Sequence, residues 1–172
     1  MRPAALALLV AVAGAAPAAQ EVSLEYRVKA AFLYNFVKYV EWPERPPREI
    51  LICVAGQNPF GTVLEQLVRN ERIHDRPLRA EVILEPRPDC NVVFTPRTSN
   101  VAAYLKAAAG MPVLTVGESP RFIESGGIIN FVAEGTSVRF EINRAAADRA
   151  RLRISSRLLQ LARIVESPAE ER

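Results

Sequence analysis

The sequence predicts an α/β fold: a single domain with a mostly parallel central sheet, a C-terminal antiparallel hairpin, and helices on both faces. Short apolar runs typical of strands alternate with amphipathic segments typical of helices, which is the pattern of a parallel sheet. The last two strand segments are separated only by a turn at 134–136, which indicates a hairpin. A length of 172 residues, 49% of them hydrophobic, suits one globular domain with its own core.

The chain begins with the pattern of a secretory signal peptide. Arg2 precedes an unbroken apolar run over residues 4–13, and Ala16 and Ala18 form an A-x-A pattern. We therefore expect a cleaved signal peptide at 1–19, a domain at 20–166 that works in the periplasm, and a disordered tail at 167–172. The apolar run is too short to span a bilayer, which takes about 20 residues. An uncleaved membrane anchor and an alanine-rich soluble helix are the alternatives.

The first element of the expected domain is a helix over residues 24–40, with Ser23 as its N-cap. Apolar side chains recur along it at i, i+4, and a second apolar side runs from residue 30 onward. A helix this apolar is covered on more than one side. The core supplies one cover, and either the core or a partner protein supplies the other. Trp42 and Pro43 end the helix, because the residue before a proline leaves the α region.

The elements that follow alternate between the two types. Apolar runs predict strands, and capping residues followed by helix formers predict helices. We expect strands over 50–55, 79–85, 90–95, 112–116, 128–133 and 137–142, helices over 62–70 and 99–109, and a short helix that begins at Ser119 and Pro120. Asn143 is expected to cap a final helical region that reaches about residue 166.

Three arginines in this last segment, Arg149, Arg153 and Arg157, are spaced four apart. On a continuous helix they would share one face, opposite an apolar stripe that docks on the core. This basic face is either a solvated surface, with the long stems covering apolar groups, or a docking surface for an acidic partner or lipid head groups. A second interpretation of the segment is a short extended break, after which Ser155 caps a separate final helix.

Composition and motifs argue against an enzyme. A net charge of +3 is too small to indicate nucleic-acid binding. The single histidine, His74, lies in a polar connection, so metal sites and histidine-dependent triads are disfavoured, and no G-x-S-x-G motif suggests a secreted hydrolase. The loop 56–61 lacks the lysine of a phosphate-binding loop. We expect no catalytic residue, no metal and no cofactor; a small-ligand sensor, with a pocket at the strand ends near Gly56 and Gly117, is the alternative.

The two cysteines, Cys53 and Cys90, form an even count in a chain that carries an export signal. Disulfides form and persist in oxidising compartments outside the cytosol. One disulfide between them is therefore favoured. Two buried free thiols that never meet are the alternative.

Several segments of the chain together resemble the YfiR/HmsC family. The longest is the end of the first helix with the Trp-Pro pair, and shorter ones follow in the same order as in the family. These segments are 29–43, 52–56 with 59–61, 114–117, 126–131, 138–143 and 152–159. The resemblance covers nearly all of the chain after the signal peptide.

This resemblance implies a non-enzymatic periplasmic repressor. Such a protein binds the periplasmic sensory domain of an inner-membrane diguanylate cyclase and lowers cyclic-di-GMP and biofilm output. The resemblance also implies an outer-membrane lipoprotein that sequesters the repressor, a homodimer, and a disulfide at Cys53 and Cys90. A second bridge, carried by relatives near the hairpin, is absent because the chain has only two cysteines.

A repressor of this kind needs a surface for its partner, and the aromatic side chains of the first helix and the following turn are the candidates. An equally good interpretation is that they belong to the core. The expected partner surface consists of Phe32, Tyr34, Phe36, Tyr39, Trp42 and Phe60.

Overall fold

The computed structural model describes residues 21–43 and 47–165. The signal peptide expected at 1–19 and the tail expected at 167–172 lie outside these residues. The helices are α1 (Leu24–Tyr39), α2 (Val63–Val68), α3 (Val101–Ala108), α4 (Arg144–Arg149) and α5 (Ser156–Leu161). The strands are β1 (Val40–Glu41), β2 (Ile50–Ala55), β3 (Arg72–Ile73), β4 (Arg76–Ile83), β5 (Val92–Thr95), β6 (Leu114–Gly117), β7 (Ile129–Glu134), β8 (Ser137–Asn143), β9 (Arg153–Ile154) and β10 (Arg163–Val165).

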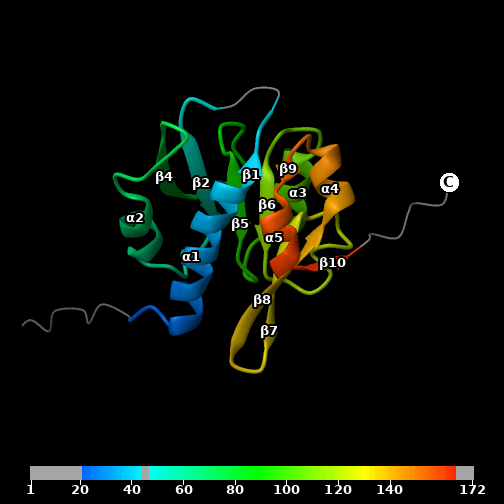
Figure 1. Ribbon diagram of the computed structural model, residues 1–172. Coiled ribbons are helices and arrows are strands. Elements are labelled where there is room, and N and C mark those ends of the chain that lie inside the picture. Colours follow the sequence, from blue (N-terminus) through cyan, green and yellow to red (C-terminus); the bar gives the residue numbers. More distant parts are fainter. Residues whose placement is uncertain (1–20, 44–46, 166–172) are drawn as a thin grey trace, which may run out of the picture.

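A mostly parallel sheet forms the centre of the molecule, as the sequence predicts (Figure 1). Among the described residues, eight strands form this sheet in the order β10-β8-β7-β6-β5-β2-β4-β3. Neighbours from β7 to β4 pair in parallel, whereas β8 pairs antiparallel with β7 across the predicted hairpin. The chain runs from β2 outward to β4 and then back past β2 to β5, so strand order reverses between β2 and β5.

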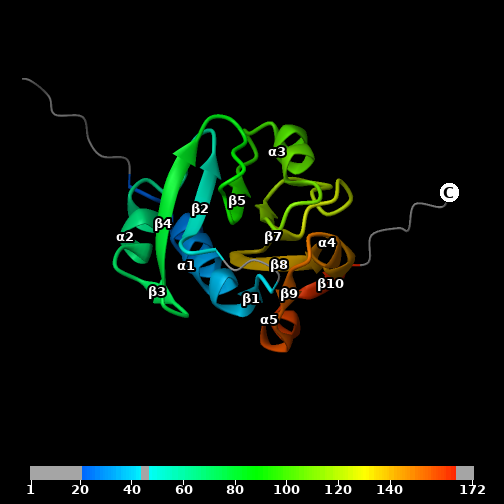
Figure 2. The same ribbon diagram turned by 90° about the horizontal axis from the view of Figure 1, so that it is seen from above.

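Helices cover both faces of the sheet, again as predicted (Figure 2). Side chains of β2 alternate between two clusters of buried residues, as the two-residue period of a strand requires. Ile50, Ile52 and Val54 belong to the cluster that contains α1, while Leu51, Cys53 and Ala55 belong to the cluster that contains Tyr104 of α3. Every residue of β2 is therefore buried, which explains its continuous apolar run.

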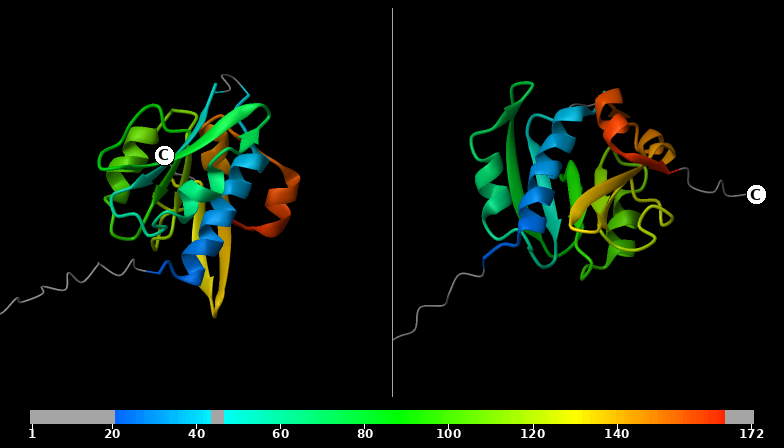
Figure 3. Two further views of the ribbon diagram at one scale, coloured as in Figure 1. Left: turned by 90° about the vertical axis from the view of Figure 1, so that its left-hand side faces the viewer. Right: turned by 60° about the horizontal axis from the view of Figure 1, so that its bottom comes forward.

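Helix α1 lies diagonally across one face of the sheet, next to α2 (Figure 3). Four phenylalanines dock it onto the β7–β8 hairpin. The ring of Phe36 lies 5.0 Å from that of Phe140 and 5.6 Å from that of Phe131, and the ring of Phe32 lies 5.3 Å from that of Phe140. Aromatic pairs at these distances add stabilisation beyond the area they bury.

The short helix expected after Ser119 is wrong, because residues 120–126 form a series of turns. Arg121 has φ +60°, which no right-handed helix contains. The side chain of Phe122 is buried between Gly117 and Gly127, where an added Cβ would lie 2.3 Å and 2.1 Å from atoms of the ring. Packing of one large side chain against two glycines thus overrides the local preference for a helix.

The continuous C-terminal helix is also wrong, and the alternative with a break at its centre is confirmed. Asn143 caps α4 by accepting from the backbone N–H of Ala146 at 2.9 Å. Helix α4 ends before Arg151, which has φ +57°. Strand β9 then pairs with β1, and Ser155 caps α5.

Candidate functional site

A groove lies between the first half of α1 and the β7–β8 hairpin. The hairpin extends past the rest of the sheet beside the start of α1 (Figures 1 and 3). The groove has a volume of about 500 Å³, and its apolar lining comes from both elements. The apolar side chains that matter most are those of Leu24, Val28, Phe32, Phe131 and Val138.

Local sequence explains both walls of this groove. Ser23 caps α1, and Leu24, Val28 and Phe32 follow at a spacing of four, so their side chains form one stripe along the helix. The opposite wall depends on the tight turn between β7 and β8, in which Gly135 has φ +59°. Only Leu24 in the stripe is largely solvent-exposed, with 77% of its surface accessible. Leu24 is continuous with the apolar stripe that lines the groove, and continuous exposed apolar surface is what marks an interaction site.

A buried ion pair connects this groove to the sheet, because Lys29 lines the groove and pairs with Glu118. The Nζ atom of Lys29 on α1 lies 2.5 Å from Oε2 of Glu118, the residue that follows β6. Only 4% of the Lys29 side chain and 1% of the Glu118 side chain are accessible to solvent. Lys29 also donates to Glu25, one turn earlier on α1, and that carboxylate is about half exposed.

The carboxylate of Glu118 has further partners that satisfy its remaining lone pairs. Its Oε1 atom accepts from the Tyr26 hydroxyl at 3.0 Å and from the Arg97 backbone N–H at 3.2 Å. The Nζ atom of Lys29 lies 4.6 Å from the centre of the Tyr26 ring, at cation–π distance. A buried charge is tolerated only when it is paired and hydrogen-bonded, and this network meets both conditions.

The network fixes the start of α1 to the carboxyl ends of β5 and β6. In open α/β sheets this edge is where ligands bind, beside the point at which strand order reverses. Here the protein's own side chains fill it. Phe60 is fully buried with its ring 5.6 Å from that of Tyr26, and Ser99 Oγ donates to the carbonyl oxygen of Ala55 at 2.7 Å.

A ligand pocket was expected near Gly56 and Gly117. Side chains cover both glycines, although Thr115 and Ser119, on either side of Gly117, line the second cavity described below. Gly117 is covered by the ring of Phe122, and a Cβ at Gly56 would lie 3.3 Å from Ser99 Oγ. Neither glycine lines the groove or the second cavity described below.

Tyr26 provides a pH-dependent test of this network. Burial, together with the negative charge of Glu118, raises the pKa of Tyr26 from 10.0 to about 12. Below pH 10 Tyr26 is neutral in both the folded and the unfolded state, so its contribution to the free energy of unfolding is fully present there. As pH rises from about 10 towards 12 the unfolded state loses its proton first, and that stabilisation is lost.

We expect Tyr26→Phe to lower the free energy of unfolding by about 1 kcal/mol at pH 7, through loss of the hydrogen bond to Glu118. The difference in the free energy of unfolding between the wild type and Tyr26→Phe should be smaller when urea unfolding is repeated at pH 11. Only the wild type has a Tyr26 that ionises on unfolding at that pH. A gap of constant size at both values of pH would contradict this assignment.

The structure divides the aromatic residues expected to form a partner surface. Phe36, Trp42 and Phe60 are buried in the core, so for them the expectation of an exposed surface is wrong. By spacing, Phe36 lies on the same helical face as Phe32, but the hairpin packs over Phe36. Trp42 donates from Nε1 to the carbonyl oxygen of Pro112 at 2.8 Å, which fixes its indole in the core.

The other three expected aromatic residues are partly exposed but do not form one surface. Phe32 lines the groove. Tyr34 donates its hydroxyl hydrogen to Glu71 at 2.8 Å, beyond the end of α2, and the hydrogen bond to that carboxylate raises the pKa of Tyr34. Tyr39, at the end of α1, accepts from the backbone N–H of Ser155 through its carbonyl oxygen. Of the three, only Phe32 belongs to the groove.

The single basic helix face is wrong as well. Arg149, Arg153 and Arg157 are all exposed, but they lie on α4, β9 and α5 respectively. The break at Arg151 separates them, so the spacing of four no longer places them on a shared face.

The disulfide is confirmed. Cys53 of β2 and Cys90, just before β5, are bonded with their Cα atoms 5.9 Å apart. Both residues are buried, on the face of the sheet that α3 covers.

Lys29 and Glu118 are the site residues that sequence analysis missed. The spacing of Lys29, Leu33 and Phe36 at i, i+4 and i+7 would have placed Lys29 on the buried side of α1, and a lysine there requires a buried partner. Glu118 gave no comparable signal, because it follows a strand in a turn-rich segment. Its role depends on packing between segments that are far apart in the chain.

Other kinds of site are not found among the described residues. In residues 21–43 and 47–165, no group of three or more His, Cys, Asp or Glu side chains is placed to hold a metal ion. Over the same residues, no helix combines the length and apolar character that a membrane span requires.

Comparison with known proteins identifies the family. A search of curated proteins found no match to this chain. The model of one protein family, described as YfiR/HmsC-like, matches residues 26–163. This match covers well over half of the chain and includes α1 from Tyr26 onward, both cysteines, Glu118 and the hairpin. The chain therefore belongs to the YfiR/HmsC-like family, as the resemblance of its sequence segments implies.

Proposed function

We propose that this protein is exported to the periplasm and represses an inner-membrane diguanylate cyclase by binding the periplasmic sensory domain of that cyclase. Membership of the YfiR/HmsC-like family is the observation that carries this proposal, because the family suggests a periplasmic regulator of such a cyclase. The signal-peptide pattern at 1–19 and the buried disulfide suit an oxidising compartment. Lower cyclic-di-GMP and less biofilm would be the result.

We place the contact for the cyclase in the groove between α1 and the β7–β8 hairpin. One wall of the groove is the apolar stripe of α1, and the Lys29–Glu118 pair anchors that helix to the end of β6. Binding surfaces on rigid elements lose less conformational entropy on association than surfaces on loops. Repression would follow if the protein binds the inactive arrangement of the cyclase more tightly, and a tenfold preference corresponds to about 1.4 kcal/mol.

An outer-membrane lipoprotein that sequesters the repressor, and a homodimer, complete the set of partners that the family resemblance implies. Both would compete with the cyclase if they use the same groove. No substrate is transformed in this scheme, and no cofactor takes part.

Leu24→Glu tests the groove with little risk to the fold. Leu24 is 77% exposed, and an acidic residue in the first turn of a helix is favourable. Leu161→Glu is the matched control, because Leu161 is 68% exposed and lies on α5, outside the groove. We expect cells that carry the Leu24→Glu variant to recover the high cyclic-di-GMP of a deletion strain, and cells that carry the control variant to remain repressed.

Copurification from solubilised membranes shows whether the effect reflects binding. The wild type and Leu161→Glu should each pull down a diguanylate cyclase that has a periplasmic domain, and Leu24→Glu should pull down at least tenfold less. If deletion of the gene leaves cyclic-di-GMP unchanged, repression is wrong. If Leu24→Glu represses as well as the wild type, the position of the contact is wrong.

A further inference from the structure

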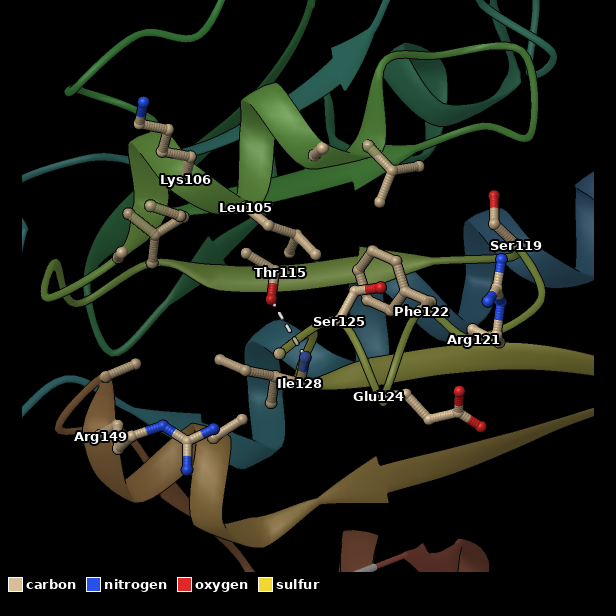
Figure 4. Close-up of a pocket in the computed structure, with 18 of the residues that line it drawn as sticks. Leu105, Lys106, Thr115, Ser119, Arg121, Phe122, Glu124, Ser125, Ile128 and Arg149 are labelled. Carbon is tan, nitrogen blue, oxygen red and sulfur yellow. Dashed lines mark hydrogen bonds between the residues drawn. The ribbon is translucent and has the colours of Figure 1, made fainter. Parts of the chain in front are cut away.

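A second cavity lies between α3, the turns at 119–126 and α4 (Figure 4). Because α3 covers the face of the sheet opposite α1, this cavity is separate from the groove (Figure 2). Its volume is about 920 Å³, within the range of small-molecule sites in proteins. A ligand could bind in this cavity whether or not the protein represses a cyclase.

The floor and one wall of this cavity are apolar. Helix α3 buries a single residue, Tyr104, although Lys106 is its only charged residue. The apolar side chains of Val101 and Leu105 line the cavity instead of the core. An apolar helix that covers the sheet with one narrow side leaves its other apolar side for a further contact. Ile128, just before β7, completes the floor.

The opposite wall is held in one conformation. The ring of Phe122 is 1% exposed and lies between Gly117 and Gly127, both of which approach it too closely to accept a Cβ. The backbone N–H of Gly127 donates to the Phe122 carbonyl oxygen at 3.0 Å, and that of Ser125 donates to the Arg121 carbonyl oxygen at 2.9 Å. The cavity therefore exists before any ligand arrives, which lowers the entropy cost of binding.

The charged side chains at this cavity are mostly cationic. Lys106, Arg121 and Arg149 line it, against one acidic residue, Glu124. Figure 4 shows the guanidinium of Arg149 beside Ile128, whereas the carboxylate of Glu124 points away from the floor. Among residues 21–43 and 47–165, the side chains of Lys106, Arg121 and Arg149 form no hydrogen bond or ion pair with another residue. Other arginines do, since Arg79, Arg87 and Arg163 each pair with carboxylates.

We propose that this cavity binds a small organic anion with an apolar body. The anionic group would pair with Arg149, and Arg121 at the other end would add to the positive field. The apolar body would lie on Leu105 and Ile128. Arginine suits this role because its planar guanidinium donates two parallel hydrogen bonds to a carboxylate.

Octanoate is a suitable probe, because it joins a carboxylate to an apolar chain. Titration of the whole exported protein, followed by two-dimensional ¹H–¹⁵N NMR, should shift amide signals in α3, the 119–126 turns and α4. Octan-1-ol tests the apolar body alone and inorganic phosphate tests the charge alone. Each should bind at least tenfold more weakly than octanoate, a difference of about 1.4 kcal/mol.

Arg149→Gln should weaken octanoate binding about tenfold, and Arg153→Gln is the matched control. Both side chains are exposed and neither has a described partner, but Arg153 lies on β9, outside the cavity. Equal binding by the two variants would overturn the proposal. So would octanoate shifts confined to the groove beside α1, or octanol binding as tight as octanoate binding, or the absence of saturable shifts.

Discussion

Replacement of Lys29 by methionine is expected to lower the free energy of unfolding by about 3–5 kcal/mol, measured by urea unfolding at pH 7. Methionine fills a similar volume but leaves the Glu118 carboxylate, only 1% of whose side chain is exposed, without its cation. The hydrogen bonds from Tyr26 and Arg97 remain, but they do not cancel a full negative charge. A loss of this size is a large fraction of the stability of an ordinary domain, which is about 5–15 kcal/mol.

A second variant distinguishes loss of the ion pair from poor packing of methionine. In Lys29→Met with Glu118→Gln the buried charge is gone, while the side-chain oxygen of the new glutamine can still accept from Tyr26 and Arg97. We expect this double variant to recover most of the lost stability, because replacing both members of a buried pair is far less costly than removing one. If the free energy of unfolding of Lys29→Met alone is within about 1 kcal/mol of the wild-type value, the pair is not a buried anchor of α1.

Removal of the disulfide is the second change with a large expected effect. Cys53 and Cys90 are 37 residues apart in the chain, and closing a loop of that length stabilises a fold by about 4 kcal/mol in the chain-entropy model. Substitution of both cysteines by alanine also removes two buried sulfur atoms from the cluster around Tyr104. We therefore expect a loss of about 4–5 kcal/mol in the free energy of unfolding, measured by urea denaturation.

Chemical reduction separates these two contributions. Wild-type protein unfolded in the presence of a reductant loses the cross-link but keeps both sulfur atoms. Its free energy of unfolding should therefore lie between that of the oxidised wild type and that of the double alanine variant. Because both cysteines are buried, reduction should be slow unless the protein unfolds. Stability that is identical with and without the reductant would show that the cross-link does not constrain the unfolded chain.

Elements with a strong periodic signal could be predicted closely from the sequence. The run of six apolar residues in β2 was placed without error, because a strand buried on both faces requires a side chain of this type at every position. The hairpin at β7 and β8 followed from two apolar runs around Gly135, whose left-handed φ the tight turn needs. Helix α1 ended at Tyr39, close to the expected end, because Trp42 and Pro43 cannot continue it.

Short elements that depend on distant partners were predicted incompletely. Strand β1 was not expected, and the extended break that contains β9 was one of two interpretations. Strands β1 and β9 have two residues each and exist because Val40 and Ile154, far apart in the chain, lie side by side. The break that frees β9 needs a left-handed residue, and Arg151 takes that conformation although its side chain gives no such indication. For this reason the basic face expected on a continuous helix does not exist.

The partner surface shows the same limit on α1 itself. Helical spacing identified the apolar positions, but Phe32 and Phe36 are equivalent by spacing and differ in the structure. Phe36 is fully buried beside the hairpin, whereas Phe32 is partly exposed and lines the groove. How far a hairpin reaches along a helix depends on the packing of the whole sheet, which no local pattern contains.

By itself the sequence determined the class of fold and the order of the long elements up to Asn143. It also favoured one disulfide between its two cysteines and resembled the YfiR/HmsC family. These properties depend on patterns within one segment, on the even number of cysteines, or on several segments in a fixed order. Only the tertiary structure decided which aromatic side chains are buried, where the two cavities lie, and that Lys29 pairs with Glu118 across 89 residues of chain. The physical reason is that burial and charge pairing are properties of positions in space, set by packing between segments that the sequence alone does not bring together.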